Sequence, residues 1–324
     1  MKLTNIIILF AAFLASTVVA TASAQSNYPE RAVNIVVGVP AGGSIDMVAR
    51  LVGQKLAEEL GQPFVIENKA GGAGVIGTNA VAKAKPDGYT LGLVPAAFIA
   101  TNKSIFAKLP YDPEADFAPI SKLVNQTMVL VVRSDSKFKS VGDLTEYAKN
   151  NPEKLNFGSG GEGSPHHLSG VLFGNKAQLK LTHIPYKGSA PALSDLLGGH
   201  VDMVFAGIPE VISNIKANKL TALAVLSGQR SSLLPTVPTL VEKGYPGVEL
   251  SAWMGLVAPA NTPQDIVQKL NQAVVKVLNA DARIKLAEVG LEASSSTPEE
   301  FSELIHNEIN LHGVLVRSAG IKPQ

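Results

Sequence analysis

The sequence predicts an α/β protein of two domains, each a mainly parallel sheet flanked by helices. Three observations lead to this prediction. Short β-branched runs alternate with segments of helical periodicity along most of the chain. The length of 324 residues exceeds what one ordinary hydrophobic core serves. No low-complexity linker divides the chain, so we expect the domains to exchange strands instead of following one another as separate units.

The segment after residue 30 predicts the order strand, helix, strand, helix, strand. Val33–Val37 is β-branched, and the apolar residues after it recur at helical spacing up to Gly61, a typical helix stop. Phe64–Glu67 and Tyr89–Val94 are the next expected strands, with a short helix ending near Lys83 between them. This order implies a parallel sheet with helical crossovers.

The alternation repeats downstream, which predicts the second sheet. The further expected strands are Val129–Val132, Lys154–Phe157, Leu181–Ile184, Val201–Phe205, Leu220–Leu226 and Leu250–Val257. The further expected helices are Val141–Asn150 with Ser140 as its cap, His166–Gly174, Ser189–Leu197, Pro209–Ala217, Pro263–Leu278, Asp281–Val289 and Pro298–Ser318.

The composition excludes several chemistries. The chain has 28 Lys plus Arg and 27 Asp plus Glu, a net charge of +1, whereas nucleic-acid binders normally carry a basic surplus. It has no cysteine, which excludes disulfides, a thiolate nucleophile, cysteine-ligated zinc, iron–sulfur clusters and a lipidated cysteine. None of the histidines stands in a metal-binding motif such as His-Glu-x-x-His, so we expect neither a metal nor a cofactor.

The N-terminus has the pattern of a secretory signal peptide. Lys2 precedes the apolar run Ile6–Leu14, and Ala22-Ser23-Ala24 is a small-residue cleavage pattern. A membrane anchor is the alternative, but a spanning helix needs about 20 apolar residues and this run is shorter. We therefore expect cleavage after Ala24 and an exported, soluble mature protein.

Three glycine-rich loops each follow an expected strand and precede an expected helix. They are Ala41–Ser44, Ala70–Gly74 and Ser159–Ser164. Glycine lets a ligand approach the backbone, and a helix N-terminus offers unpaired N–H groups that attract anions. One such loop could be only a tight turn. Three of them, at the strand ends where open α/β sheets place their ligands, favour an anion-binding cleft.

A few polar side chains in these loops are candidates for shaping the cleft. Asp46 is expected to complement the helix N-terminus and so to shape its loop. The hydroxyls of Ser44, Ser159 and Ser164 can bind a carboxylate, cap the helices, or do both. His167 either points into the cleft or bonds the loop backbone.

The remaining histidines have less specific expected roles. His166 is expected to be a polar residue on a helix face, and the two histidines of the C-terminal helix, His306 and His312, are expected to be solvated. The single tryptophan, Trp253, is expected in a core or at the junction of the domains.

Other motif-based functions are weakly supported. No Gly-x-Gly-x-x-Gly follows the first strand with a suitable acidic partner, and no glycine loop ends in Gly-Lys-Ser/Thr. No Gly-x-Ser-x-Gly elbow is present. An exported hydrolase or isomerase would have only Ser159 or Ser164 with His167 as a reactive set. A signalling subunit without a transport role is a further alternative.

A series of motifs makes the mature chain resemble the Bug family, the periplasmic substrate-binding proteins of tripartite tricarboxylate transporters. The segments that carry the resemblance are Tyr28-Pro29, Ile35–Val37, Pro40–Asp46, Ala49-Arg50, Glu67-Asn68, Ala70–Gly72, Pro86–Leu91, Leu109–Pro113, Asp116-Phe117, Asn156–Gly161, His167-Leu168, Pro185–Gly188, Pro191-Ala192, Asp195–Gly199, Leu234–Thr239 and Trp253–Pro259.

The resemblance implies a periplasmic binding protein of the Venus flytrap kind, type II-like, with two crossovers and no enzymatic activity. Domain 1 would comprise residues 26–127 plus 253–324, and domain 2 residues 128–252. The expected ligand is a small carboxylate, either a di- or tricarboxylate or an aromatic or aliphatic acid. The expected partners are the membrane subunits of the transporter, or a sensor protein, and no nucleic acid.

Carried onto this chain, the family's ligand loops lie after the strands of both domains. The residues implied to bind ligand are Ala41, Gly42, Gly43, Ser44, Asp46, Ala96, Ala97, Ser159, Gly160, Ser164, His167, Ala206 and Gly207.

Some positions depart from the family pattern. Ala206 stands where family members often carry an acidic residue, and Ala96-Ala97 where small polar residues are common. Both differences favour a ligand with an apolar or aromatic body over an amino acid. His166 replaces a smaller residue, and Ile45 replaces a common threonine.

Overall fold

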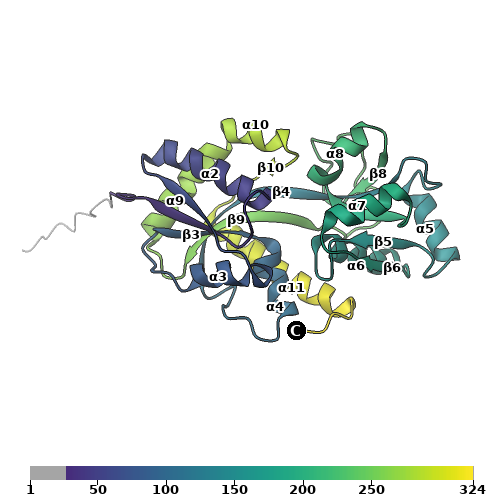
Figure 1. The fold of residues 1–324 in the computed structure, drawn as a ribbon, viewed down its shortest axis with the longest axis horizontal. Coiled ribbons are helices and arrows are strands. Elements are labelled where there is room, and N and C mark those ends of the chain that lie inside the picture. Colours follow the sequence, from purple (N-terminus) through teal and green to yellow (C-terminus); the bar gives the residue numbers. More distant parts are fainter. Residues whose placement is uncertain (1–26, 324) are drawn as a thin grey trace, which may run out of the picture.

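The computed structural model describes residues 27–323, and the signal peptide expected at residues 1–24 lies outside this range. Two lobes lie side by side, and two long strands, β4 and β9, lie where the lobes meet (Figure 1). We call the lobe that contains the strand β1 (Val33–Val37) the first lobe, and the lobe that contains β5 (Asn156–Ser159) the second lobe. The mixed α/β architecture predicted from the sequence is confirmed.

The first lobe is a sheet between two layers of helices. Its strands are β1, β2 (Phe64–Asn68), β3 (Thr90–Pro95), β9 (Ser251–Pro259) and the first half of β4 (Phe117–Arg133), and the short β10 (Glu292–Ala293) pairs with β4. Its helices are α2 (Ser44–Leu60), α3 (Val75–Ala82), the π-helix η2 (Ala97–Thr101) with α4 (Asn102–Ile105), α9 (Gln264–Leu278) and α10 (Asp281–Glu288). β1 pairs in parallel with β2 and β3, as the βαβαβ pattern predicts.

Successive side chains of a strand point to opposite faces of the sheet, so the first lobe has one hydrophobic cluster on each face. Val33, Ile35 and Val37 of β1 pack against α2 and α9, whereas Val36 joins the opposite face with α3. Helix α2 ends where the sequence predicts, because Gly61 takes the left-handed conformation and its N–H donates to the Ala57 carbonyl at 3.0 Å.

The second lobe repeats the layered plan. Its strands are β5, β6 (Thr182–Pro185), β7 (Met203–Gly207), β8 (Leu220–Val225) and the second half of β4. Helices α5 (Val141–Asn150) and α6 (Pro165–Ala177) cover one face, and α7 (Ser189–Gly198) and α8 (Ile208–Lys216) cover the other. The predicted cap of α5 is confirmed, because Ser140 and Asp143 form a complete capping box.

Strand β4 is shared by the two lobes. Phe117–Thr127 pairs antiparallel with β9, and Met128–Arg133 pairs antiparallel with β7 and β8. Ile120 therefore belongs to the core of the first lobe, whereas Met128 belongs to that of the second. The sequence identified only the second half of this strand.

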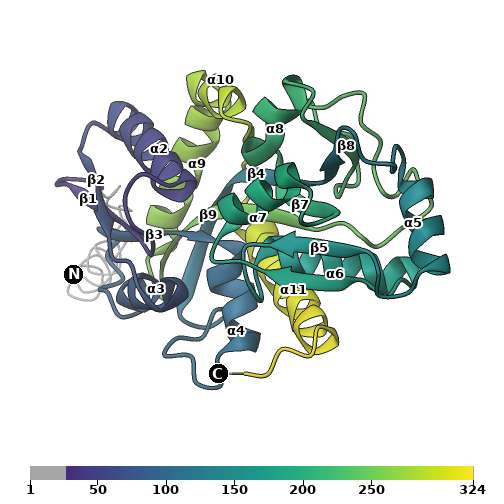
Figure 2. The same cartoon turned by 45° about the vertical axis from the view of Figure 1, so that its right-hand side comes forward.

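The C-terminal helix α11 (Pro298–Ser318) packs into both cores. Phe301 lies in the core of the first lobe, and Leu315 and Val316 lie in that of the second. The Asn175 side chain of α6 donates to the Ser318 hydroxyl at 3.0 Å. Figure 2 shows α11 between α4 and α6. The last turns of the chain, which we expected in domain 1, therefore contact the second lobe.

Candidate binding cleft between the lobes

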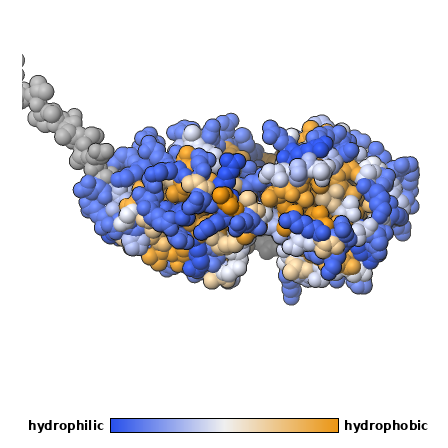
Figure 3. All heavy atoms as spheres, turned by 90° about the horizontal axis from the view of Figure 1, so that it is seen from above, coloured by the Kyte–Doolittle hydropathy of each residue, from blue (hydrophilic) through white to orange (hydrophobic). Residues whose placement is uncertain are grey.

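The strand directions place two sets of strand ends opposite each other. β3 and β4 both run antiparallel to β9, so β3 ends toward the second lobe, whereas β7 runs antiparallel to β4 and ends toward the first. Pro95 at the end of β3 pairs with Met254 of β9, which in turn pairs with Val124 of β4. Gly207 at the end of β7 pairs with Met128 of β4, four residues further along the same strand. Four residues of extended strand span about 13 Å. Seen from above, the molecule narrows between its two lobes (Figure 3).

The first glycine loop lies at this edge of the first lobe. Ala41–Ser44 is exposed, and Gly42 has a φ of 95°, which favours glycine. Helix α2 begins after Gly43, which offers no capping side chain. The N–H groups of the first turn therefore remain available to an anion.

Asp46 fixes the conformation of this loop, and both of its carboxylate oxygens accept hydrogen bonds. Its carboxylate accepts from the Gly42 N–H at 2.9 Å, from Arg50 Nε at 2.9 Å and from Asn68 Nδ2 at 2.9 Å. The hydrogen bond from Arg50 lowers the pKa of Asp46 to about 2. Because Arg50 is neutralised in this way, the loop holds no free cation, and the predicted shaping role of Asp46 agrees with its contacts.

The second glycine loop holds internal packing together. Gly71–Gly74 all have positive φ, Ala73 included, and the Asn102 side chain donates to the Ala73 carbonyl at 3.1 Å. A Cβ on Gly74 would overlap the Phe98 ring. This loop fixes the position of η2 against α3.

The third glycine loop forms the facing edge of the second lobe, with its serines turned inward. The Ser159 hydroxyl is buried, lies 2.6 Å from His183 Nε2, and accepts from the Gly161 N–H at 3.1 Å. The Ser164 hydroxyl donates to the Gly161 carbonyl at 2.6 Å and accepts from the His167 N–H at 3.3 Å. Both hydroxyls are thus bonded within the second lobe, by the loop itself and by His183 of β6, which leaves the loop backbone for a ligand.

His167 bonds the loop backbone, the second of the two roles considered for it. Its Nδ1 accepts from the Gly163 N–H at 3.1 Å, and its ring stacks on His183 with 3.7 Å between centroids. Burial lowers the pKa of both histidines to about 4, so both are neutral at pH 7. Neither Ser159 nor Ser164 bonds the His167 ring, so the reactive set of the hydrolase hypothesis does not form.

The alanines that are expected to contact a ligand have side chains that are buried or half-buried. Ala96 and Ala206 are buried in the two cores, so only their backbones can reach the cleft. Ala97 is half-buried at the start of η2, and the Gln126 side chain covers Gly207. The apolar side chain of Ala206 therefore says nothing about the body of the ligand.

Sequence reasoning missed a polar cluster at this edge of the second lobe. His166 Nε2 lies 2.8 Å from Glu210 Oε2, and Gln126 Nε2 donates to Glu210 Oε1 at 3.3 Å. His166 and Glu210 are 44 residues apart, and only their places in the first turns of the helices that follow the paired strands β5 and β7 could have indicated the contact.

Several other expectations concern residues outside the cleft. Trp253 is fully buried and packs edge-on against Phe301 in the core of the first lobe. His312 is buried, contrary to expectation, because its face of α11 turns toward η2, where Thr101 Oγ1 lies 2.7 Å from its Nδ1. Within residues 27–323, no group of three or more metal-ligating side chains could hold an ion.

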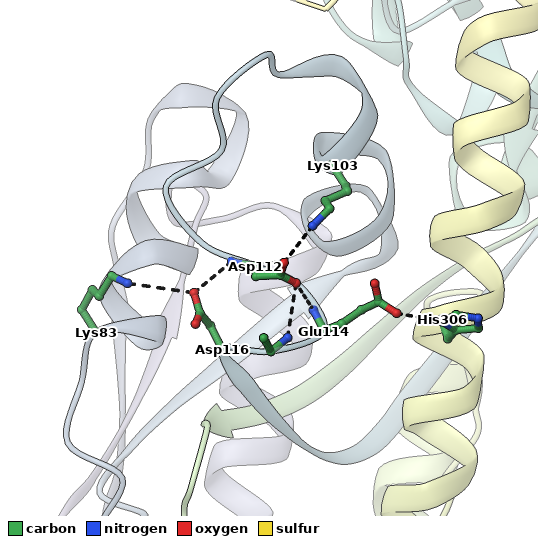
Figure 4. A network of polar contacts seen from close by, with 7 residues as sticks. Lys83, Lys103, Asp112, Glu114, Asp116 and His306 are labelled. Carbon is green, nitrogen blue, oxygen red and sulfur yellow. Dashed lines mark hydrogen bonds and ion pairs between the residues drawn. The ribbon is translucent and has the colours of Figure 1, made fainter.

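The Leu109–Pro113 motif, which contributes to the family resemblance, is fixed by its own polar network (Figure 4). Asp112 accepts from Lys103 Nζ at 3.0 Å and from the Glu114 N–H at 2.9 Å. Glu114 in turn lies 2.7 Å from His306 Nδ1 on α11. These contacts tie the motif to α4 and α11, so its role is structural.

Comparisons with known proteins agree with this architecture. A family model described as the tripartite tricarboxylate transporter family receptor matches residues 48–321. Protein BugT of Bordetella pertussis is 36% identical over 324 residues, 99% of each chain. In the part of the chain that the structure describes, no helix has the length and apolar character needed to cross a membrane.

Solved structures extend the similarity to the fold. A Rhodopseudomonas palustris protein described with adipate is 36% identical with a TM-score of 0.78, covering 92% of this chain and all of its own, 100%. MatC of Rhodopseudomonas palustris with bound malate is 33% identical with a TM-score of 0.73, covering 89% of this chain and 100% of its own. The chain therefore belongs to the tripartite tricarboxylate transporter receptor family, whose members are periplasmic binding proteins and not enzymes.

Proposed function

We propose that the protein is exported to the periplasm, loses its signal peptide after Ala24 and captures a small carboxylate between its lobes. One observation carries the proposal. Helices α2, α7 and α8 begin at the facing strand ends, and their N-cap residues are Gly43, Gly188 and Gly207, none with a capping side chain. Uncapped N–H groups bind anions without any cationic side chain.

Not every helix at the facing strand ends is open, because the Ser164 hydroxyl caps the start of α6. The proposed anion contacts are therefore limited to the starts of α2, α7 and α8. The relatives described with adipate and malate bind small carboxylic acids of the kind we propose here.

Binding would act by shifting the balance between open and closed arrangements of the lobes. A carboxylate that contacts the Ala41–Ser44 loop and the Ser159–Ser164 loop together binds the closed form more tightly, and only this difference drives closure. We take residues 26–127 plus 253–324 and residues 128–252 as the moving units, with the end of α11 docked on the second. The closed form would deliver the solute to the membrane subunits of a tripartite tricarboxylate transporter or to a sensor protein.

Isothermal titration calorimetry against succinate, malate, adipate, citrate and benzoate tests the proposal. We expect saturable binding of at least one of these acids by the mature protein, with a stoichiometry of one. Mass spectrometry of any small molecule that remains bound after purification identifies the natural solute. A folded protein that binds none of these acids would refute the proposal.

A further inference from the structure

A groove of about 510 Å³ lies on the first lobe, between the start of α11 and the segment that leads into β4. Its apolar lining consists of Pro113, Pro119 and Ile305. Pro113 is buried and Ile305 is 3% exposed, so this lining is part of the fixed body of the lobe. The groove therefore offers apolar surface that an incoming chain could cover.

The wall of the groove opposite α11 is held by the polar network of the Leu109–Pro113 motif. Lys103 Nζ donates to Asp112 at 3.0 Å, and Glu114, which lines the groove, lies 2.7 Å from His306 Nδ1 on α11 (Figure 4). These contacts tie the two walls together and use the charges of Asp112 and Glu114. A partner would thus meet a preorganised surface, which lowers the entropic cost of binding.

Two glutamates on the α11 side of the groove are exposed and have no partner. Glu299 and Glu303 line the groove, and neither forms a hydrogen bond or an ion pair with any residue between 27 and 323. Glu300 between them is used in the capping box. The helix dipole favours an acid in the first turn, which accounts for Glu299 but not for Glu303 in the second turn. Like charges four residues apart in a helix also repel each other.

The charges of the groove are therefore unbalanced. In the part of the chain that the structure describes, no Lys or Arg side chain lines the groove. Apolar surface beside unpaired carboxylates is complementary to a segment that carries both basic and apolar side chains.

The spacing of the two glutamates matches an extended segment. Four residues of helix rise about 6 Å, and alternate side chains of an extended chain are about 7 Å apart on one side. Two basic residues separated by one apolar residue would thus reach Glu299 and Glu303 together. The residue between them would point to the other side, toward Pro113 and Pro119.

The groove is remote from the cleft between the lobes. Pro119 precedes Thr127, the last residue of β4 that pairs with β9, by eight residues, or about 26 Å of extended strand. All the residues that line the groove belong to the first lobe. An occupant would leave the cleft open to solute, and the groove keeps its shape whether the lobes are open or closed.

We propose that this groove is a docking site for a partner protein, which inserts an extended segment with Lys or Arg alternating with apolar residues. The inference rests on the proposed function in one respect, because that function requires a partner to receive the solute. The carboxylates of Glu299 and Glu303 pair with the basic side chains, and Pro113, Pro119 and Ile305 contact the apolar ones.

Fluorescence anisotropy with labelled peptides tests the inference. The probe alternates three arginines with leucines between glycine ends, and two control peptides replace either every arginine by glutamine or every leucine by serine. For the wild type we expect saturable, micromolar binding of the probe, and at least about fivefold weaker binding of each control. Raising the salt from about 50 to about 300 mM should weaken binding of the probe, because exposed charges are screened.

Two variants of the groove separate charge from shape. Glu299→Gln/Glu303→Gln should bind the probe about 3- to 30-fold more weakly, as for two lost exposed ion pairs. The matched control is Glu146→Gln/Glu288→Gln, which removes two exposed glutamates of α5 and α10 and should bind within about twofold of wild type.

The second variant is Ser302→Tyr, which puts a large side chain into the groove from an exposed helix position. It should weaken binding of the probe, whereas Asn307→Tyr, exposed on α11 outside the groove lining, should not. Circular dichroism checks that all four variants are folded.

The outcomes distinguish the inference from the proposed function. Equal losses in the two glutamate double variants would show that the probe senses only net charge and would overturn the docking site. Equal binding of the probe and the glutamine peptide also overturns it. Calorimetry with carboxylates on the same proteins gives a separate reading: a wild type that binds acids but not the probe refutes the docking site alone, and one that binds the probe but no acid refutes the proposed function alone.

Discussion

Asp46 and Arg50 lie one helical turn apart, and the Arg50 Nε lies 2.9 Å from a carboxylate oxygen that also accepts from the Gly42 N–H. One buried acid thus neutralises Arg50, which lies in the second turn of α2, and fixes the loop backbone. The anion site that we propose in the first lobe therefore consists of N–H groups, whose geometry depends on Asp46.

Asp46→Asn should lower the free energy of unfolding in a pH-dependent way. The pKa of Asp46 in the folded protein is about 2, below its ordinary value, so its stabilisation is full above pH 4 and is lost as the pH falls toward 2. Because Arg50 is half exposed, we expect a loss of about 1–2 kcal/mol at pH 7. Urea denaturation of wild type and variant at pH 7 and at pH 3 measures it. Glu162→Gln, which removes an exposed carboxylate, is the control. Equal stabilities of wild type and Asp46→Asn at pH 7 would contradict this role.

Ser44→Glu should abolish carboxylate binding without unfolding the protein. Ser44 is exposed at the first position of α2, where a glutamate suits the helix dipole but repels an incoming anion. Ser44→Gln has nearly the same size without the charge and should bind within about threefold of wild type, since it leaves the backbone N–H groups in place. Calorimetry measures the affinities, and circular dichroism confirms folding. Retained binding in Ser44→Glu would remove this loop from the site.

Because of the stacked pair His167 and His183, the free energy of unfolding should decrease as the pH falls below neutral. Both have a pKa of about 4 in the folded protein and an ordinary value of 6.5, so the unfolded chain binds more protons between these values. Stability from these groups is complete above pH 6.5 and is lost toward pH 4, with a slope of up to about 1.4 kcal/mol per pH unit for each histidine. Urea denaturation between pH 4.5 and 7.5 measures the slope. It should be shallower in His183→Gln and unchanged in His306→Gln, and identical slopes in all three proteins would rule out a role for the pair.

Leu315→Ala should destabilise the protein although it lies close to the end of the chain. Leu315 is 2% exposed in the core of the second lobe, so its truncation should cost about 2–5 kcal/mol. The neighbouring Val314 is 55% exposed, and Val314→Ala should change stability by less than about 0.5 kcal/mol. Thermal and urea unfolding compare the two variants. Similar small effects would show that the end of α11 does not dock in solution.

Elements with local signals could be predicted from the sequence. The end of α2 at Gly61 and the starts of α5 and α11 follow from glycine and capping residues within one helical turn. The first half of β4 could not be predicted, because Pro119 and the bulges near it break the alternation, and its partner β9 lies more than a hundred residues away.

In the candidate site, too, features with a local sequence signal were predictable and features that depend on distant contacts were not. The loops of the cleft follow from glycine patterns after strands, and so their positions were predictable. The partners of individual side chains were not, because they depend on tertiary contacts. Ser159 meets His183 across 24 residues, and His166 meets Glu210 across 44. The spacing of residues within one segment does not reveal contacts between distant segments. For the same reason, the sequence did not show that the hydroxyls of Ser159 and Ser164 bond within the second lobe.

The helix that packs into both cores limits how the lobes can move. Two paired strands alone would let one lobe swing and also rotate about the strand axis relative to the other. A third attachment below the sheet, through Phe301 at one end and Leu315 at the other, resists that rotation. In the closure that we propose, the lobes would therefore bend along one path, and each closure would bring the same backbone donors to the solute.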